Sequence, residues 1–408
     1  MPGFDRAHVL AAPAVSEAAA APARPGALRA LSIGMTWVPE QPANGLDRGY
    51  YEHVRHLPPA GVSVRGLVAG TPDVERQSGG AVRAFASDKA SLVTRVMRLR
   101  RAVRQELVQF DPDVVIAHFA LHGAPAVDLF RRPLVVHFHG PWAAESAVEG
   151  GSGMSVAMKR VLEKRLYRHA TRFVVLSKAF RKLLIEGYGV DEARVRIVPG
   201  GVDVQAFDLG VPRDEARNRL GWPADRRIIL SVRRLMRRMG LEGLIEAMEA
   251  VRQSAPGSLL LIAGRGPHAA ALQAEIDARG LGDHARLLGF VPDEHLPLAY
   301  AAADISVMPT VALEGFGLPT VESLASGTPV LVTPQGGLPE VVTDLDPQLV
   351  CEDVSAGALA ERIGDVFSGR VVLPTAEACR SYARAGFSWE SVARRLAVVY
   401  REAHDERG

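Results

Sequence analysis

The sequence predicts an α/β protein built from two Rossmann-like, doubly wound domains that face each other. Short apolar runs alternate with amphipathic segments of helix length, which is typical of parallel sheets flanked by helices. The runs fall into two sets, and 408 residues suffice for two domains with separate cores. The first set of strand candidates is 28–35, 62–68, 114–119, 134–139, 172–177 and 195–200. The second set is 227–232, 258–264, 285–291, 304–310 and 329–333.

Composition shifts place the domain boundaries. Residues 1–26 are Ala- and Pro-rich and are expected to be a disordered tail. Residues 27–206 then form the N-terminal domain, and the polar, Pro- and Gly-interrupted segment 207–225 is expected to be a linker. Residues 226–386 form the C-terminal domain. Residues 387–408 carry apolar positions at helical spacing, which predicts a helix that packs back towards the N-terminal domain.

The bulk composition excludes several classes of protein. A net charge of +2 lacks the basic excess of a nucleic-acid binder, so no nucleic-acid partner is expected. No apolar run is long enough to span a bilayer. Cys351 and Cys379 are too few for a disulfide framework and lack zinc-site spacing, so we expect inert core residues in a reducing cytoplasm. Oligomeric state cannot be deduced from the sequence.

The segment EGFGLPTVE, residues 314–322, is the strongest functional signal. It lies where a strand should pass through a loop into a helix. Gly315 and Gly317 allow backbone amides to approach a ligand, and the following helix N-terminus favours an anion such as a diphosphate. Glu314 in the loop and Glu322 on the helix can accept hydrogen bonds from sugar hydroxyls, but they cannot easily flank one bond as a glycosidase pair does. The alternative is a capped helix with a solvated glutamate face.

This segment resembles the Glu-x7-Glu motif of the family-four retaining glycosyltransferases, which have the two-domain GT-B fold. The resemblance extends over most of the chain through VRIVPGGVDVQAF, IILSVRRLMRRMGLEGLIEAM and GGLPEVV. It implies that Glu314 contacts the donor sugar and that Glu322 binds the ribose. It also implies that backbone amides hold the sugar and the phosphates; these amides belong to Gly315, Phe316, Gly317 and Leu318.

The resemblance also implies an activity. It makes 27–206 the acceptor-side domain and 226–386 the nucleotide-sugar domain, with a UDP- or GDP-sugar as co-substrate and neither a cofactor nor a metal. The implied reaction is metal-independent, front-face transfer of a hexose-type sugar to a small-molecule, natural-product or glycan acceptor. A covalent intermediate stays open. Rival functions are a nucleotide-sugar epimerase of the same fold and a non-catalytic nucleotide-sugar binding module.

Basic residues follow the first strand of the second set. Arg234 matches the family's phosphate-binding arginine, and the family usually places a lysine where this chain has Met239. Arg237 or Arg238 is therefore expected to contribute the second positive charge, which a guanidinium can do bidentately. A solvated basic turn is the alternative.

Two further loops are expected beside the nucleotide base. Gly264, Gly266 and Ala269 fit a dinucleotide-binding pattern, although no acidic residue ends the next strand as that pattern requires. By resemblance, Arg265 lies in the loop near the base, and Val291 lies where the family pairs its backbone with the base. A surface arginine and a core valine are the alternatives.

Histidines mark the first half of the chain. His137 and His139 share one face of a strand, and His118 is expected on a neighbouring strand. Three clustered histidines can bind zinc, but no carboxylate or cysteine accompanies them, so we predict no metal site. By resemblance, His139 reaches the donor sugar, while His118 and His137 are expected to be interior histidines.

The remaining candidates lie in other loops and helices. Trp142, Glu145 and Ser146 follow the histidine strand and are acceptor-side candidates. Gly45, after Asn44, resembles the family's first glycine-rich loop, which faces the diphosphate. Asp111 and Asp113 resemble the metal-binding Asp-x-Asp of another glycosyltransferase fold, but Pro112 favours a turn. Basic helix patterns near 89–107 and 158–172 predict weak peripheral contact with anionic membranes, or simply solvated faces.

Overall fold

The computed structural model describes residues 26–38 and 45–406. These residues divide into two compact units. The N-terminal unit runs to Gly201 and resumes at Trp389, and the C-terminal unit is Val202–Ser388. The last residues of the chain therefore complete the unit that the first half of the chain begins. Predicted tail residues 1–25 lie outside the described residues, as does Asn44.

A seven-stranded parallel sheet forms the centre of the N-terminal unit, with strand order β3-β2-β1-β4-β5-β6-β7. Each strand is rich in buried aliphatic residues, as expected where both faces of a sheet are covered. The strands are β1 Leu28–Ile33, β2 Val62–Ala69, β3 Val82–Ala86, β4 Val114–Ala117, β5 Leu134–Phe138, β6 Arg172–Val175 and β7 Val195–Ile197.

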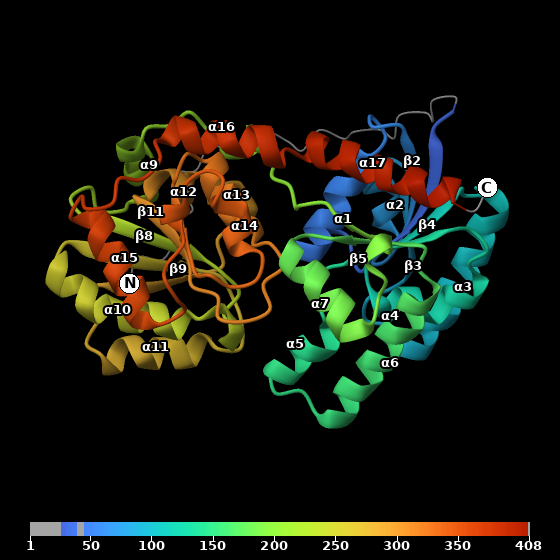
Figure 1. Cartoon of the computed structure of the whole chain (residues 1–408), viewed down its shortest axis with the longest axis horizontal. Helices are drawn as coiled ribbons and strands as arrows, with labels where there is room; N and C mark the ends of the chain where they lie inside the picture. The colour runs from blue at the N-terminus through green and yellow to red at the C-terminus, as the bar shows by residue number, and fades with distance from the viewer. Residues whose placement is uncertain (1–25, 39–44, 407–408) are drawn as a thin grey trace. The chain divides into compact units, whose positions relative to one another are not determined.

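Two apolar cores cover the faces of this sheet, because successive strand residues point to opposite sides. One core packs the sheet against α3, α6 and α7, and the other packs it against α1 and α17 (Figure 1). The helices of this unit are α1 Gly45–His56, α2 Asp73–Gln77, α3 Leu92–Gln109, α4 Ala120–Gly123, α5 Trp142–Val148, α6 Gly153–His169, α7 Lys178–Tyr188 and α17 Trp389–Asp405. Short 3-10 turns are Ala124–Leu129 and Glu192–Arg194.

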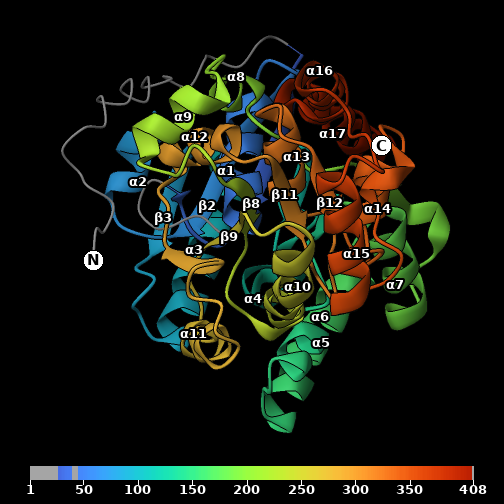
Figure 2. The same ribbon diagram turned by 90° about the vertical axis from the view of Figure 1, so that its left-hand side faces the viewer.

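The C-terminal unit contains a five-stranded parallel sheet with strand order β10-β9-β8-β11-β12. Its strands are β8 Arg227–Val232, β9 Ser258–Ala263, β10 Ala285–Gly289, β11 Ile305–Met308 and β12 Val330–Val332. Helices α10 Leu241–Ser254, α11 Ala269–Ala278 and α15 Ala356–Phe367 cover one face. Helices α12 Leu296–Ala302, α13 Leu318–Ala325 and α16 Ala376–Phe387 lie on the other (Figures 1 and 2).

The remaining elements of this unit are short. They are α8 Val204–Phe207, α9 Arg213–Leu220, α14 Leu338–Val342 and the 3-10 turns Arg237–Met239, Asp293–His295 and Pro347–Leu349. Since all five strands are parallel, their carboxyl ends meet at one edge of the sheet, and the loops that leave this edge carry the predicted donor-site residues.

Each strand predicted from the sequence coincides with a strand of the structure, but the prediction missed β3. This strand, VRAFA, has two alanines and an arginine and lies at the edge of the sheet, so its apolar pattern is weak.

The segment 207–225, expected as a linker, contains α9 and is part of the C-terminal unit. Its polar composition is misleading because one arginine is buried: Arg217 donates to the carbonyls of Ala302, Ala224 and Arg226 and pairs with Asp304. These bonds fix α9 against α12 and the start of β8. Across the described residues, no helix is both long and apolar enough to cross a membrane.

Candidate functional site at the carboxyl edge of the second sheet

The loop between β11 and α13 holds Glu314 in a fixed backbone conformation. Leu313 has a φ of +53° and Gly317 a φ of +79°, so the chain turns sharply on both sides of Glu314. The Glu314 carbonyl accepts a hydrogen bond of 3.0 Å from the amide of Gly337. A Cβ on Gly336 would lie 2.0 Å from the same carbonyl oxygen. Glycine is therefore required at position 336 for the loop after β12 to hold Glu314.

The carboxylate of Glu314 forms an ion pair with Arg233, which directly follows β8. Nη2 of Arg233 donates to Oε2 of Glu314 and to the hydroxyl of Thr310. The Arg233 side chain is 4% exposed and that of Glu314 is 13% exposed. Burial favours a higher pKa for Glu314, but the Arg233 guanidinium outweighs it, with Arg238 and the Phe316 amide assisting, and holds the pKa below its usual value. Glu314 is thus an ionised carboxylate.

Arg238 forms hydrogen bonds with the same loop. It is buried, its Nη1 donates to the Leu313 carbonyl at 3.0 Å, and its own carbonyl accepts from Val311 at 3.0 Å. The two arginines expected to replace the missing lysine therefore differ: Arg238 braces the Glu314 loop, while Arg237 is exposed in the 3-10 turn. Met239 is buried.

The loops after β8 and β9 interlock at this edge. A Cβ on Gly264 would lie 1.8 Å from the Arg233 carbonyl oxygen, and one on Gly266 would lie 2.1 Å from that of Leu235. The Leu235 amide donates to the Arg265 carbonyl at 2.9 Å. Gly264 and Gly266 thus allow the backbone of the loop after β9 to approach the backbone of the loop after β8 closely. Arg234, between these fixed points, is exposed.

Helix α13 begins at Leu318 and presents Glu322 from its second turn. Glu322 is only 6% exposed, and the hydroxyl of Tyr300 on α12 donates to its Oε2 at 3.3 Å. Phe316, in the loop before the helix, is buried against Phe387 with ring centroids 5.7 Å apart. Glu322 is therefore a buried carboxylate, not part of the solvated glutamate face that was the alternative for this segment.

The two base-side candidates have different environments. The guanidinium of Arg265 lies 4.5 Å from the ring centroid of Phe290, a cation–π contact at the end of β10. Val291 is buried. The roles of Arg265 and Val291 toward a nucleotide base stay predictions.

Sequence reasoning missed Arg233. Arg234 matches the family pattern, but Arg233, the first arginine of the doublet, points into the protein and contacts Glu314. The sequence placed the arginine doublet at the carboxyl end of β8, where ligands of a parallel sheet bind, but it did not show which of the two side chains turns inward.

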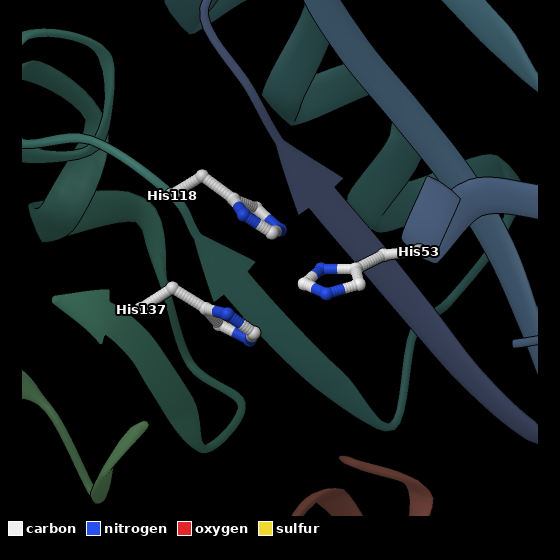
Figure 3. Close-up of side chains that lie close together, drawn as sticks. All are labelled: His53, His118 and His137. Carbon is white, nitrogen blue, oxygen red and sulfur yellow. The ribbon is translucent and has the colours of Figure 1, made fainter. Parts of the chain in front are cut away.

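In the N-terminal unit, three buried histidines converge beside the sheet. His118 directly follows β4, His137 lies in β5, and His53 reaches them from α1 (Figure 3). The rings of His118 and His137 have centroids 4.4 Å apart. His139 continues the row, with its Nε2 3.4 Å from Nδ1 of His118. The predicted clustering of His118, His137 and His139 at neighbouring strands is therefore confirmed, while His53 on α1 was not predicted.

Burial keeps these imidazoles neutral. It lowers the pKa of His53 to about 3 and that of His139 to about 4, and it holds the pKa values of His118 and His137 well below the usual range. Nε2 of His137 lies 2.7 Å from the Tyr400 hydroxyl on α17, so the row is anchored to the last helix of the chain.

The trio of His53, His118 and His137 has ligand nitrogens within 4.8 Å of one another. Neutral imidazoles can bind a transition metal. This group, however, includes no carboxylate or thiolate, so a divalent ion would bring its full charge into a buried site without an anionic ligand. The three rings pack against one another, and Nδ1 of His53 is buried without a hydrogen-bond partner among the described residues. The group therefore fits packed neutral imidazoles better than a metal centre.

The three acceptor-side candidates lie on α5. Lys159 of α6 donates to the Ser146 hydroxyl at 2.6 Å, and its Nζ lies 5.2 Å from the Trp142 ring centroid. Phe119 packs beside Trp142 with centroids 4.9 Å apart. Glu145 faces Gly140, where a Cβ would lie 2.6 Å from its Oε1. Lys159 is thus an addition that the sequence did not single out.

Gly45 is the first residue of α1 and is exposed. Asp113 receives hydrogen bonds from Arg29, and Asp111 pairs with Arg132, so these two aspartates are engaged in surface ion pairs rather than directed at a metal.

Comparison with known proteins gives the class of this protein. A family model described as "Glycosyl transferases group 1" matches residues 212–386, and one described as "Glycosyltransferase Family 4" matches residues 43–206. The D-inositol 3-phosphate glycosyltransferase of Mycobacterium tuberculosis is 30% identical over 396 residues, which cover 89% of this chain and 80% of the relative. This protein is a glycosyltransferase enzyme. It belongs to glycosyltransferase family 4.

Solved structures support the fold. Sucrose-phosphate synthase from Thermosynechococcus elongatus superposes with a TM-score of 0.76 at 22% identity, over 93% of this chain and all of that one. Anabaena Alr3699/HepE, in complex with UDP and glucose, gives a TM-score of 0.75 at 20% identity, over 92% of this chain and all of that one. The predicted GT-B fold is confirmed.

The glycine clamp on Glu314 is testable with a matched pair of variants. Gly336 and Gly280 have φ values of +60° and +61°, but only Gly336 has a neighbour that a Cβ would strike. Gly280→Ala should lose about 1 to 2 kcal/mol of unfolding free energy from backbone strain alone. Gly336→Ala should lose more in urea titrations, with faster hydrogen exchange at the Gly337 amide. Equal losses and unchanged exchange would contradict the clamp.

The buried histidines predict an acid sensitivity. The unfolded His53 has a pKa near 6.5 and the folded one about 3. Between these values only the unfolded state binds the proton, so stability present above about pH 6.5 falls as the pH is lowered. His53→Leu should reduce the dependence of the unfolding free energy on pH by up to about 1.4 kcal/mol per pH unit, measured in urea titrations from pH 7 to 4.5. His169→Gln, an exposed control at the end of α6, should leave this dependence unchanged.

Proposed function

We propose that this glycosyltransferase moves a hexose-type sugar from a UDP- or GDP-sugar to a small-molecule, natural-product or glycan acceptor, with retention at the anomeric carbon. The observation that carries the proposal is the pinned loop that presents ionised Glu314 directly before α13, with Glu322 buried on that helix. The complex of the Anabaena relative with UDP and glucose supports a nucleotide-sugar donor.

The proposed chemistry breaks the bond between the anomeric carbon and the diphosphate oxygen and forms a bond from that carbon to the acceptor oxygen. The leaving diphosphate gains negative charge, which exposed Arg234 and the N-terminus of α13 would stabilise. In a front-face reaction the leaving phosphate oxygen takes the acceptor proton, so no protein base and no metal are needed.

Glu314 accepts hydrogen bonds from the sugar hydroxyls in this proposal, and Glu322 accepts them from the ribose. A carboxylate suits both tasks because its two oxygens accept hydrogen bonds from hydroxyl groups. His139 is proposed as a further sugar contact. Its neutral imidazole, with the pKa lowered to about 4 by burial, can donate from one nitrogen and accept at the other.

Product analysis separates this proposal from its rivals. Thermal-shift screening against UDP-, GDP- and ADP-sugars identifies the donor, and proton NMR of the product reports the anomeric configuration. Retained configuration is the expected result, and inversion would overturn the proposed stereochemistry. Epimerised sugar formed from donor without acceptor would indicate an epimerase. Donor binding with neither transfer nor hydrolysis would indicate a binding module.

The role of Glu322 is testable by titration calorimetry with UDP and GDP. Glu322→Ala should weaken binding of the preferred nucleotide by about 1.5 to 3 kcal/mol, the scale of a hydrogen bond to a charged group. Glu361→Ala, an exposed glutamate on α15, is the matched control and should bind as the wild type does. Unchanged affinity in Glu322→Ala would remove the ribose assignment.

We also propose weak contact of the N-terminal unit with anionic membranes. Helices α3 and α6 expose apolar side chains beside arginines and lysines; the most exposed are Val93, Met97, Val108, Met154, Met158 and Val161. Apolar insertion combined with attraction to anionic headgroups is the mode by which such surfaces bind a bilayer interface.

Vesicle sedimentation checks this proposal. The wild type should sediment with phosphatidylglycerol vesicles and not with phosphatidylcholine vesicles, and binding should fall as salt is added. A Val93→Ser, Met97→Ser, Met158→Ser variant should lose most of the binding. Val372→Ser, an exposed valine of the C-terminal unit, is the control. Equal binding to both vesicle types, or no binding, would refute the contact.

A further inference from the structure

Arg233 is a buried cation at the ligand-binding edge of the second sheet, and the family resemblance assigns a role to Arg234 and none to Arg233. Its Nη2 contacts Oε2 of Glu314 and the hydroxyl of Thr310. Its Nε is buried and has no hydrogen-bond partner among the described residues. Its backbone is fixed by the close approach of Gly264 to its carbonyl. The Arg233 backbone is therefore fixed by Gly264, and its guanidinium is fixed by Glu314 and Thr310.

Stability alone does not account for this residue. A buried ion pair is often no more stabilising than apolar side chains of the same volume, because two charges must leave water. An apolar residue after β8 would pack without an unsatisfied Nε. The pair also lies at the edge where ligands of parallel sheets bind, and its acidic member is the residue proposed to hold the donor sugar.

We propose that Arg233 is a positioning residue for donor-sugar recognition: it occupies Oε2 of Glu314 and thereby fixes the orientation of the carboxylate, so that Oε1 is left for the sugar hydroxyls. The inference rests on the proposed nucleotide-sugar donor and adds to it a specific dependence of sugar binding, but not of nucleotide binding, on Arg233.

Among the described residues, few charged groups face Glu314, so the dependence of sugar binding on Arg233 can be tested by pH. Arg233 faces it from the end of β8, and Arg238 faces it from the turn before α10. Helix α13 carries Glu322 as its titratable side chain, and the loop 333–337 that packs on the Glu314 carbonyl carries none. Removing Arg233 leaves burial as the main influence on Glu314, so its pKa should rise and the carboxylate should protonate nearer to neutral pH.

The test measures the affinities of UDP and UDP-glucose by calorimetry at pH 8 and pH 6, with GDP and GDP-glucose as the second pair. In the wild type both affinities should change less than twofold between these pH values. In Arg233→Met, UDP should bind within twofold of wild type, while UDP-glucose should weaken at least tenfold at pH 8 and several-fold more at pH 6. Arg370→Met breaks an exposed arginine–aspartate pair with Asp365 and should behave as wild type.

Thr310→Val is a second, milder variant in case Arg233→Met does not fold. It removes the other contact of the Arg233 Nη2 without altering Glu314. It should weaken the binding of UDP-glucose several-fold and leave the affinity for UDP unchanged. The inference is overturned if nucleotide and nucleotide sugar weaken by the same factor, or if neither variant alters UDP-glucose affinity or its pH dependence. A wild type that binds no nucleotide sugar would instead refute the proposed function itself.

Discussion

The buried ion pair between Arg233 and Glu314 is the interaction on which the candidate site depends. It joins the end of β8 to the loop after β11, and these two strands are adjacent in the second sheet. Burial favours a higher pKa for Glu314, but the guanidinium holds that pKa below its usual value. The same loop is held at its backbone by Gly336 and Gly337 after β12 and by Arg238 before α10. Neighbouring loops thus converge on one glutamate.

This use of arginine changes how positive charge is distributed at the site. Met239 is buried where the family usually has a lysine, and Arg238 is engaged with the Leu313 carbonyl. Two buried guanidiniums therefore serve the loop that carries Glu314. The charge of a bound diphosphate would fall mainly to exposed Arg234 and to the start of α13. Electrostatic support for the leaving group and support for the sugar-binding loop are divided between different residues.

The fold was largely predictable because its strands are continuous apolar runs, which parallel sheets covered on both faces require. Strand β3 escaped because an edge strand with alanine and arginine lacks that signal. Glycine spacing and paired glutamates identified the Glu314 loop. Arg233 could not be assigned, because which arginine of a doublet turns inward depends on contacts with a loop about 80 residues away, and no local pattern encodes this.

Helix α17 gives the N-terminal unit a discontinuous origin in the chain. The Tyr400 hydroxyl contacts His137 of β5, and Trp389, Val392 and Leu396 complete the core on that face of the first sheet. During synthesis, the residues up to Gly201 leave the ribosome long before this helix exists. One face of the first sheet therefore stays incompletely covered until the whole C-terminal unit has been synthesised. The core of the N-terminal unit can therefore be completed only after the C-terminal unit has been translated.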